Sequence, residues 1–351
     1  RHDAGATWSG LIDVEPYVAP PGLVPRSSGW INNLLVPATD RIYAFYTWNA
    51  ENVTSDPTGH VTNFNLLGAW VCRYSDDGGA SWSAQRFNLS GVYEKRDIDY
   101  SNSWGGRVLQ GWSVGKPFVA DDGRTVLMQF SKVSTAAGRS EGFFLRATNA
   151  LDPATPPAAL DFELVPRGKY GLRAPTGTTA EEGNVVQLRR AGSFYAVYRT
   201  ACGFVGVATS PDGVAWTDAQ YARFDGADYG GGMYEARVKQ PIGPLTPRRF
   251  SNGRFLMSVF GNSEVPGFSS RDPYWLVAGW EANGTIRWSQ PELMLCTRVE
   301  PRLATRRVAR ELMPSRSVQV RAAAVRGRAL WHRLPRLRRG GHGIASRYAL
   351  R

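Results

Sequence analysis

The chain has 351 residues, of which 42% are hydrophobic and 12% aromatic, so it can build a sizeable core and a wholly disordered chain is excluded. No run of sequence approaches the ~20 consecutive apolar residues of a membrane-spanning helix. The net charge of +12 is confined to one end, because residues 298–351 hold 15 arginines and two glutamates whereas residues 1–297 hold 27 basic and 28 acidic residues. Residues 1–297 therefore offer no basic stripe for nucleic acid.

Residues 1–297 predict strands and turns almost throughout. Short runs rich in Val, Tyr, Phe and Trp recur, and each is bounded by Gly, Asp, Asn or Pro, the residues of β-turns. No 12-residue stretch combines a 3.6-residue apolar period with helix caps, so we expect few helices. Many short strands joined by Gly-rich turns favour a sandwich, a barrel or a propeller. In chain order the predicted strands are 42–48, 70–74, 125–130, 194–198, 255–260 and 274–278.

A short turn motif recurs at widely spaced points and decides between these architectures. Residues 75–82 read SDDGGASW, residues 1–8 read RHDAGATW, residues 210–216 read SPDGVAW, and residues 282–288 (ANGTIRW) are a degenerate copy. In such a unit the Asp accepts hydrogen bonds from turn amides, the Gly allows a positive φ, and the Trp packs between neighbouring strand pairs. We expect each unit on the hairpin between the third and fourth strands of a four-stranded blade, with a structural rather than catalytic aspartate.

These copies resemble the Asp boxes, or BNR repeats, of the sialidase (neuraminidase) superfamily. The resemblance implies an all-β fold, a six-bladed β-propeller over residues 1–297, and about 50 residues per blade agrees with six blades. We expect the last blade to be incomplete, because the sequence changes character at residue 298. The Arg-rich tail, residues 298–351, is expected to be disordered or non-native, for example through a shifted reading frame. The alternative is an arginine-rich arm that binds nucleic acid or another anionic partner.

The order of motifs in the middle of the chain is similar to that of the central sialidase blade. There a glutamate opens the blade, an arginine closes the next strand and an Asp box follows, which here implies Glu182, Arg199 and residues 210–216. The resemblance implies that Glu182 activates the nucleophile and that Arg199 binds a sugar carboxylate together with Arg271 and Arg26, although the usual Arg-Ile-Pro at Arg26 is absent. The alternative for each is a surface charge or a strand-end ion pair.

The resemblance leaves the proton donor open. Glu51 lies where the family has an aspartate, and Asp97 and Asp99 lie in a loop where the family places acids that contact the substrate, so Glu51 and Asp99 are the catalytic candidates and Asp97 a binding one. Trp112 and Lys116 belong to a stretch rich in Trp and Gly that we expect to form a wall of the site, since Trp faces stack on sugar rings. The alternative for Trp112 is packing between blades.

The tyrosine that serves sialidases as nucleophile is missing from its expected place. It should follow the third arginine, near residue 300, and the sequence there contains no tyrosine. Tyr274 and Tyr234 could substitute, but neither has the right sequence context. The implied activity, that of an exo-sialidase-type glycoside hydrolase on a carboxylate-bearing sugar, is therefore expected to be impaired.

Two alternatives to this activity stay open. One is a propeller polysaccharide lyase, in which a Tyr or His would abstract the proton beside the carboxylate of a uronic acid while an arginine neutralises that carboxylate, or a uronate-linked glycosidase. A propeller with a degenerate site could instead bind acidic glycans without turnover.

The expected partner is a glycan or glycoconjugate substrate, with no nucleic acid and no membrane span; the oligomeric state is open. No cofactor is expected, and the four histidines are too dispersed to form a metal site. Sequons at Asn52, Asn88 and Asn283 favour a secreted or lumenal protein.

Overall fold

The computed structural model describes one part of the chain in detail: residues 6–15, 27–50, 67–92, 109–134, 139–168, 170–177, 179–189, 192–225, 237–238, 240, 243–260, 271 and 273–295. The chain divides into two units, residues 1–314 and 315–351, and every described residue belongs to the first. The predicted domain boundary after residue 297 lies outside the described residues and stays a prediction.

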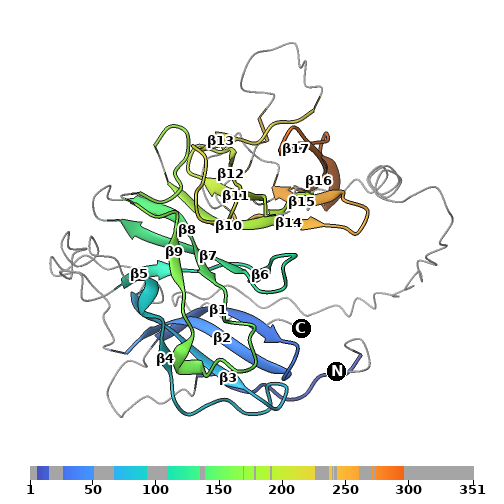
Figure 1. Ribbon diagram of the computed structural model, residues 1–351. Helices are drawn as coiled ribbons and strands as arrows, with labels where there is room; N and C mark the ends of the chain where they lie inside the picture. The colour runs from blue at the N-terminus through green and yellow to red at the C-terminus, as the bar shows by residue number, and fades with distance from the viewer. Residues whose placement is uncertain are drawn as a thin grey trace, which may run out of the picture. The chain divides into compact units, whose positions relative to one another are not determined.

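The described residues form an all-β fold, as the sequence predicts, in three antiparallel sheets of nine, four and five strands (Figure 1). The nine-stranded sheet consists of two units joined only by a short pairing of residues 67–68 with residues 109–110, so four units follow one another along the chain. The first unit contains β1 (Ser27–Val36), β2 (Arg41–Asn49), β3 (Leu67–Ser75) and β4 (Phe87–Asn88). The second contains β5 (Leu109–Trp112), β6 (Phe118–Val119), β7 (Val126–Ser134), β8 (Arg139–Ala147) and β9 (Glu163–Val165). The third contains β10 (Ala180–Gln187), β11 (Phe194–Thr200), β12 (Val205–Ser210) and β13 (Gln220–Tyr221). The fourth contains β14 (Thr246–Arg249), β15 (Phe255–Phe260), β16 (Tyr274–Ala282), β17 (Thr285–Trp288) and β18 (Glu292–Leu295).

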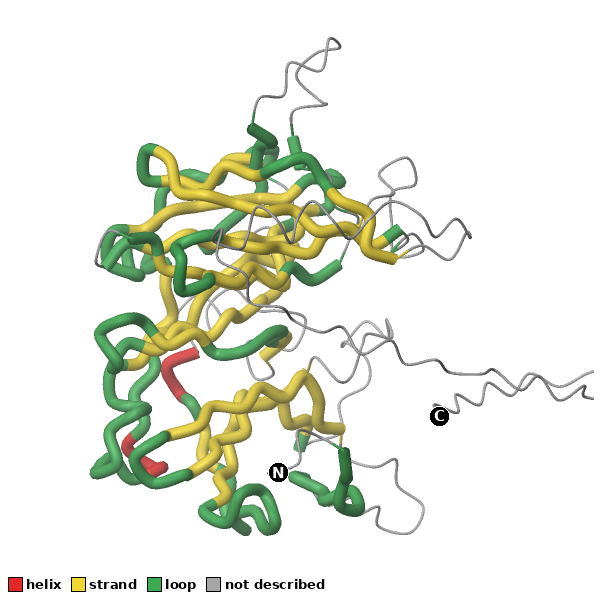
Figure 2. Tube along the Cα trace, turned by 90° about the vertical axis from the view of Figure 1, so that its right-hand side faces the viewer, coloured by secondary structure: helices red, strands yellow, loops and turns green. Residues whose placement is uncertain are grey.

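Helices are few, as predicted. The described residues hold two short 3-10 helices, η2 (Ser90–Val92) and η3 (Pro157–Ala159), and Figure 2 shows how strands dominate the described trace. The six predicted strands correspond to β2, β3, β7, β11, β15 and β16. No helix among the described residues is both long and apolar enough to cross a membrane.

The six-bladed ring is not confirmed. The part of the chain that the structure describes holds four units, and none of its sheets closes on itself. The third unit begins at Ala180 and the fourth at Thr246, which is more chain than the ~50 residues per blade behind the prediction.

The hydrophobic core lies between successive units. Trp70 of β3 meets Phe130 of β7 edge to face, with ring centroids 5.2 Å apart, and this pair joins the first unit to the second. Trp288 of β17 is fully buried and its indole N–H donates to the hydroxyl of Tyr195 in β11 at 3.2 Å, which joins the fourth unit to the third. Burying these large rings between sheets is the main favourable term that fixes one unit against the next.

The turn motifs lie where the sequence places them. Residues 75–81 link β3 to β4 and residues 210–216 link β12 to β13, the third and fourth strands of their units. Asp77 accepts hydrogen bonds from the amide of Ser81 at 2.9 Å and from the Ser81 hydroxyl at 2.6 Å. Asp212 accepts from the amides of Val214 and Ala215 at 2.8 and 2.9 Å. Both aspartates therefore serve the turn itself.

The tryptophans of the motif differ from copy to copy. Trp216 stacks on Phe144 of β8, with centroids 4.9 Å apart and planes 23° apart, and so packs between the second and third units as predicted. Trp8, from the first copy, is 84% exposed, so the packing expected of it is wrong. The fourth copy is a two-residue hairpin, because Asn283 and Gly284 both have positive φ, as a type I′ turn requires.

Candidate functional site

Glu182 and Arg199 lie at the strand ends of the third unit opposite its turn motif, residues 210–216. The register of β11 and β12 pairs Phe194 with Ser210, where the motif begins, and Arg199 with Val205 at the far end. Five residues of strand separate these pairs, about 17 Å. Arg271 precedes β16, which runs away from it toward the Asn283 turn. The turn motifs and the predicted site residues thus occupy opposite ends of their strands.

A β-bulge in β10 presents Glu182. The pairing of β10 with β11 shifts register between Glu181 and Asn184, and Glu182 has a φ of 45°. Gly183 allows this bulge, since a Cβ there would lie 2.4 Å from the carbonyl oxygen of Val197. The amide of Glu182 donates to the hydroxyl of Ser131 on β7 at 3.0 Å. A non-glycine residue with positive φ is strained, and such strain collects at functional sites.

Arg199 forms ion pairs with both consecutive glutamates. Its Nη1 lies 2.7 Å from Oε2 of Glu182, and its Nε donates to Oε2 of Glu181 at 2.9 Å. The hydroxyl of Ser140 donates to the other oxygen of Glu181. Arg199 is 5% exposed and Glu182 is 6% exposed, so these charges interact in a medium that screens them far less than water does.

The pKa of Glu182 is raised above its ordinary value. Burial of the carboxyl is the largest cause, and the charge of Arg199 opposes it. The neighbouring Glu181 raises the pKa further, whereas a hydrogen bond from Trp112 and the charge of Arg271 lower it. A carboxyl in these surroundings can exchange a proton closer to neutral pH than an exposed glutamate can.

The structure brings four of the predicted site residues together. Arg199, Trp112 and Arg271 each act on Glu182: Arg199 through an ion pair, Trp112 through a hydrogen bond and Arg271 through its charge. Trp112 is 5% exposed and paired through its backbone with Ser131, so its ring lines the cluster from the second unit.

Arg26, Glu51, Asp97 and Asp99 lie outside the described residues, so their roles stay predictions. Lys116 lines a separate pocket.

Glu181 is a member of the cluster that the sequence analysis missed. In a regular strand, consecutive side chains point to opposite faces, so Glu181 and Glu182 should not share a partner. The bulge removes that alternation and lets both reach Arg199. The signal that could have revealed it is the Glu-Glu-Gly run, because glycine after a polar pair at the start of a strand often marks a bulge.

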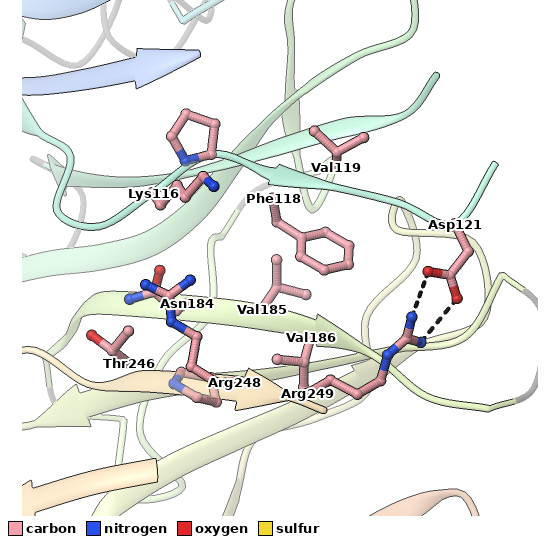
Figure 3. Close-up of a pocket in the computed structure, with 12 residues that line it drawn as sticks. Lys116, Phe118, Val119, Asp121, Asn184, Val185, Val186, Thr246, Arg248 and Arg249 are labelled. Carbon is pink, nitrogen blue, oxygen red and sulfur yellow. Dashed lines mark hydrogen bonds and ion pairs between the residues drawn. The ribbon is translucent and has the colours of Figure 1, made fainter. Parts of the chain in front are cut away.

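A pocket of about 320 Å³ lies between β6, β10 and β14 (Figure 3). It is lined by Lys116, by Asn184 and by Arg248, among others, and Asn184 follows Glu182 by two residues on β10. Among the described residues no group of three or more His, Cys, Asp or Glu could hold a metal ion. The nucleophile stays unassigned: Tyr274 packs its ring against Phe260, and Tyr234 lies outside the described residues.

Comparison with known proteins shows which solved structures share this fold. No family model matches the sequence, and no curated protein matches it. The structure is similar to the Hadza microbial sialidase Hz136, with a TM-score of 0.53 and 15% identity over 84% of this chain and 51% of that one. It is also similar to the intramolecular trans-sialidase from Ruminococcus gnavus, solved with oseltamivir carboxylate, with a TM-score of 0.50 and 13% identity over 84% of this chain and 76% of that one.

The predicted likeness to the sialidase superfamily is confirmed at the level of the fold. The chain spans about half the length of the first of these sialidases. At this sequence identity the similarity establishes the fold alone, and the chemistry has to be inferred from the residues of the site.

Proposed function

We propose that the chain acts on glycans that end in a carboxylate-bearing sugar, as an exo-sialidase-type glycoside hydrolase. The observation that carries the proposal is the ion pair between Arg199 and Glu182, a buried glutamate with a raised pKa on which the charge of Arg271 also acts. The sialidase-like fold supports the same class of substrate.

The roles follow from the chemistry of the groups. Arg199 and Arg271 would hold the sugar carboxylate, because planar guanidinium groups bind carboxylates through two parallel hydrogen bonds. Glu182 would accept the proton of the nucleophile, a role that suits a carboxyl whose pKa is raised by burial. Arg26 and Glu51 or Asp99 would complete the site as the third arginine and the proton donor, within a six-bladed propeller.

Binding would rearrange the charges of the cluster. In the free protein Arg199 is engaged by Glu181 and Glu182. A substrate carboxylate would compete with Glu182 for Arg199, and a Glu182 carboxylate that loses this partner becomes a stronger base. Glu181 would keep Arg199 in place throughout, because it holds the guanidinium through a second edge.

The direct test is turnover of a fluorogenic sialoside by the full chain. Glu182→Gln should abolish turnover and leave the fold unchanged, and Arg199→Ala should chiefly raise KM for the anionic substrate. The matched controls are Glu292→Gln on β18 and Arg254→Ala in the turn before β15, which remove the same charges outside the cluster. Unchanged kinetics in both cluster variants would refute the assignment.

A second candidate, acidic-glycan binding without turnover, is favoured by one observation. The carboxylate of Glu182 is already paired with Arg199, and the described residues contain no assigned nucleophile. Sialoside binding by the wild-type chain, measured by calorimetry and lost in Arg199→Ala, together with no release of the fluorophore, would establish this function instead. A product that absorbs in the ultraviolet on a uronate polymer would identify the lyase alternative.

A further inference from the structure

The pocket between β6, β10 and β14 is distinct from the Glu182 cluster and is lined by residues of three successive units. Its floor is apolar, formed by Phe118 of β6 and by Val185 and Val186 of β10. Its volume of about 320 Å³ lies within the range of small-ligand sites. Figure 3 shows the apolar side chains in the middle, between two groups of charged residues.

The two ends of the pocket differ in charge. At one end Arg249 donates to Asp121 at 2.9 Å and to the carbonyl oxygen of Gln187 at 3.1 Å, so that its charge is neutralised. At the other end lie Lys116 and Arg248, beside Asn184 (Figure 3). Both are exposed, and within the described part of the chain neither forms an ion pair. Two positive charges without an acidic partner therefore face the pocket at this end.

The backbone of the segment that carries Lys116 packs closely against β10 at this cationic end. Gly115 has a φ of 112°, and a Cβ there would lie 2.4 Å from Oδ1 of Asn184, so only glycine lets the segment that carries Lys116 approach. The amide group of Asn184 in turn donates to the carbonyl oxygen of Leu245, the residue before β14. Asn184 thus fixes the segments that carry Lys116 and Arg248 relative to each other.

We propose that this pocket holds a second acidic sugar, so that the protein binds two consecutive carboxylate-bearing residues of one glycan. The inference rests on the proposed function, in which Arg199 and Arg271 hold the first carboxylate. Lys116 and Arg248 take the second carboxylate, Asn184 and Thr246 meet ring hydroxyls, and Phe118 meets an apolar face of the ring. Asn184 follows Glu182 by two residues, so their Cα atoms lie at most about 7 Å apart, and neighbouring residues of one oligosaccharide can occupy both places.

The test compares a ligand with one carboxylate and a ligand with two. The methyl glycoside of sialic acid and a disialic acid are titrated by calorimetry into the full chain carrying Glu182→Gln, so that neither is consumed. In this background the disaccharide should bind about 10-fold more tightly than the monosaccharide, the value of one additional charged hydrogen bond. Lys116→Gln and Arg248→Gln should each remove most of this advantage while leaving monosaccharide binding within two-fold. Arg254→Gln, which removes an equal charge outside the pocket, should leave both affinities unchanged.

The outcomes separate this inference from the proposed function. Equal affinity for the two ligands overturns the second subsite and leaves the proposed function standing. The same holds if the Lys116 and Arg248 variants lose affinity equally for both ligands. Failure of the wild-type chain to bind either ligand overturns the proposed function, and the subsite with it. The second subsite and the proposed function are both supported if Arg199→Ala abolishes binding of both ligands while Lys116→Gln removes only the higher affinity for the disaccharide.

Discussion

Arg199 lies 2.7 Å from the carboxylate of Glu182, yet the pKa of Glu182 is raised rather than lowered. Removal of the carboxyl from water outweighs the attraction of the guanidinium, and the adjacent charge of Glu181 adds to the effect. The arginine is itself shared with Glu181, so its charge serves two carboxylates at once. The cluster is therefore an unfavourable place for a negative charge, which is the condition under which a glutamate exchanges protons near neutral pH.

This relationship predicts a pH-dependent effect of Glu182→Gln on stability. Because the pKa of Glu182 is raised in the folded state, its contribution to stability is fully present below its ordinary value of 4.5 and is lost as the pH rises through the raised pKa. Glutamine does not titrate. The free energy of unfolding of the variant minus that of the wild type, measured by urea denaturation, should therefore increase between pH 4 and pH 8, because only the wild type loses stability over this range. A difference that stays constant or moves in the opposite direction would contradict the raised pKa.

The bulge that presents Glu182 should depend on Gly183. In Gly183→Ala the new Cβ would meet the Val197 carbonyl oxygen at 2.4 Å and the Tyr198 Cβ at 3.0 Å, and neither belongs to a flexible group. We expect a loss of about 2 kcal/mol in the free energy of unfolding, typical of an overpacked core, together with loss of sialoside turnover. Gly10→Ala is the control, since no atom lies within 4 Å of its added Cβ. Wild-type stability and turnover in Gly183→Ala would show that the bulge does not set the position of Glu182.

The strands could be predicted from sequence because each carries a local signal. Apolar runs between Gly, Asn and Asp turns located β2, β11 and β15, and the Ser-x-Asp turns located the third and fourth strands of two units. The number of blades has no such local signal, because it depends on the length of the connections, which carry no periodic pattern. Trp8 shows the same limit, since its motif matches but its ring stays exposed.

The site was predictable where it depends on motif order and not where it depends on backbone irregularity. Glu182 and Arg199 follow from the order of the motifs, near the start of one strand and near the end of the next, and the structure puts them in contact. Glu181 and Ser140 escaped prediction because a regular strand would send Glu181 to the other face. The cationic end at Lys116 and Arg248 depends on the approach of three separate segments, which no local pattern encodes.

The turn motif at residues 75–81 should contribute to the stability of the fold and not to the binding of substrate. Hydrogen bonds from Ser81, through its side chain and its backbone, lower the pKa of Asp77 to about 2. A depressed pKa contributes stability above the ordinary value of 3.8, and this contribution is lost as the pH falls toward 2. Asp77→Asn should therefore lower Tm at pH 7, and the difference from the wild type should narrow between pH 4 and pH 2. Asp218→Asn, at an exposed loop position, should leave Tm unchanged. Altered sialoside binding by Asp77→Asn at pH 7 would contradict a purely structural role.

The stack of Trp216 on Phe144 should be one of the contacts that hold the second and third units together. Trp216 is half-buried, so Trp216→Ala should cost about 2 kcal/mol, below the range for fully buried tryptophans. Trp8→Ala serves as the matched control, because that ring comes from the same motif and is 84% exposed, and its effect should stay within about 0.5 kcal/mol. A double-mutant cycle with Phe144→Leu should give a coupling of about 1 kcal/mol, the extra value of an aromatic pair beyond its buried area. Additive effects of the two substitutions would mean that the rings are neighbours without being coupled, and that the adjoining apolar core alone fixes the two sheets.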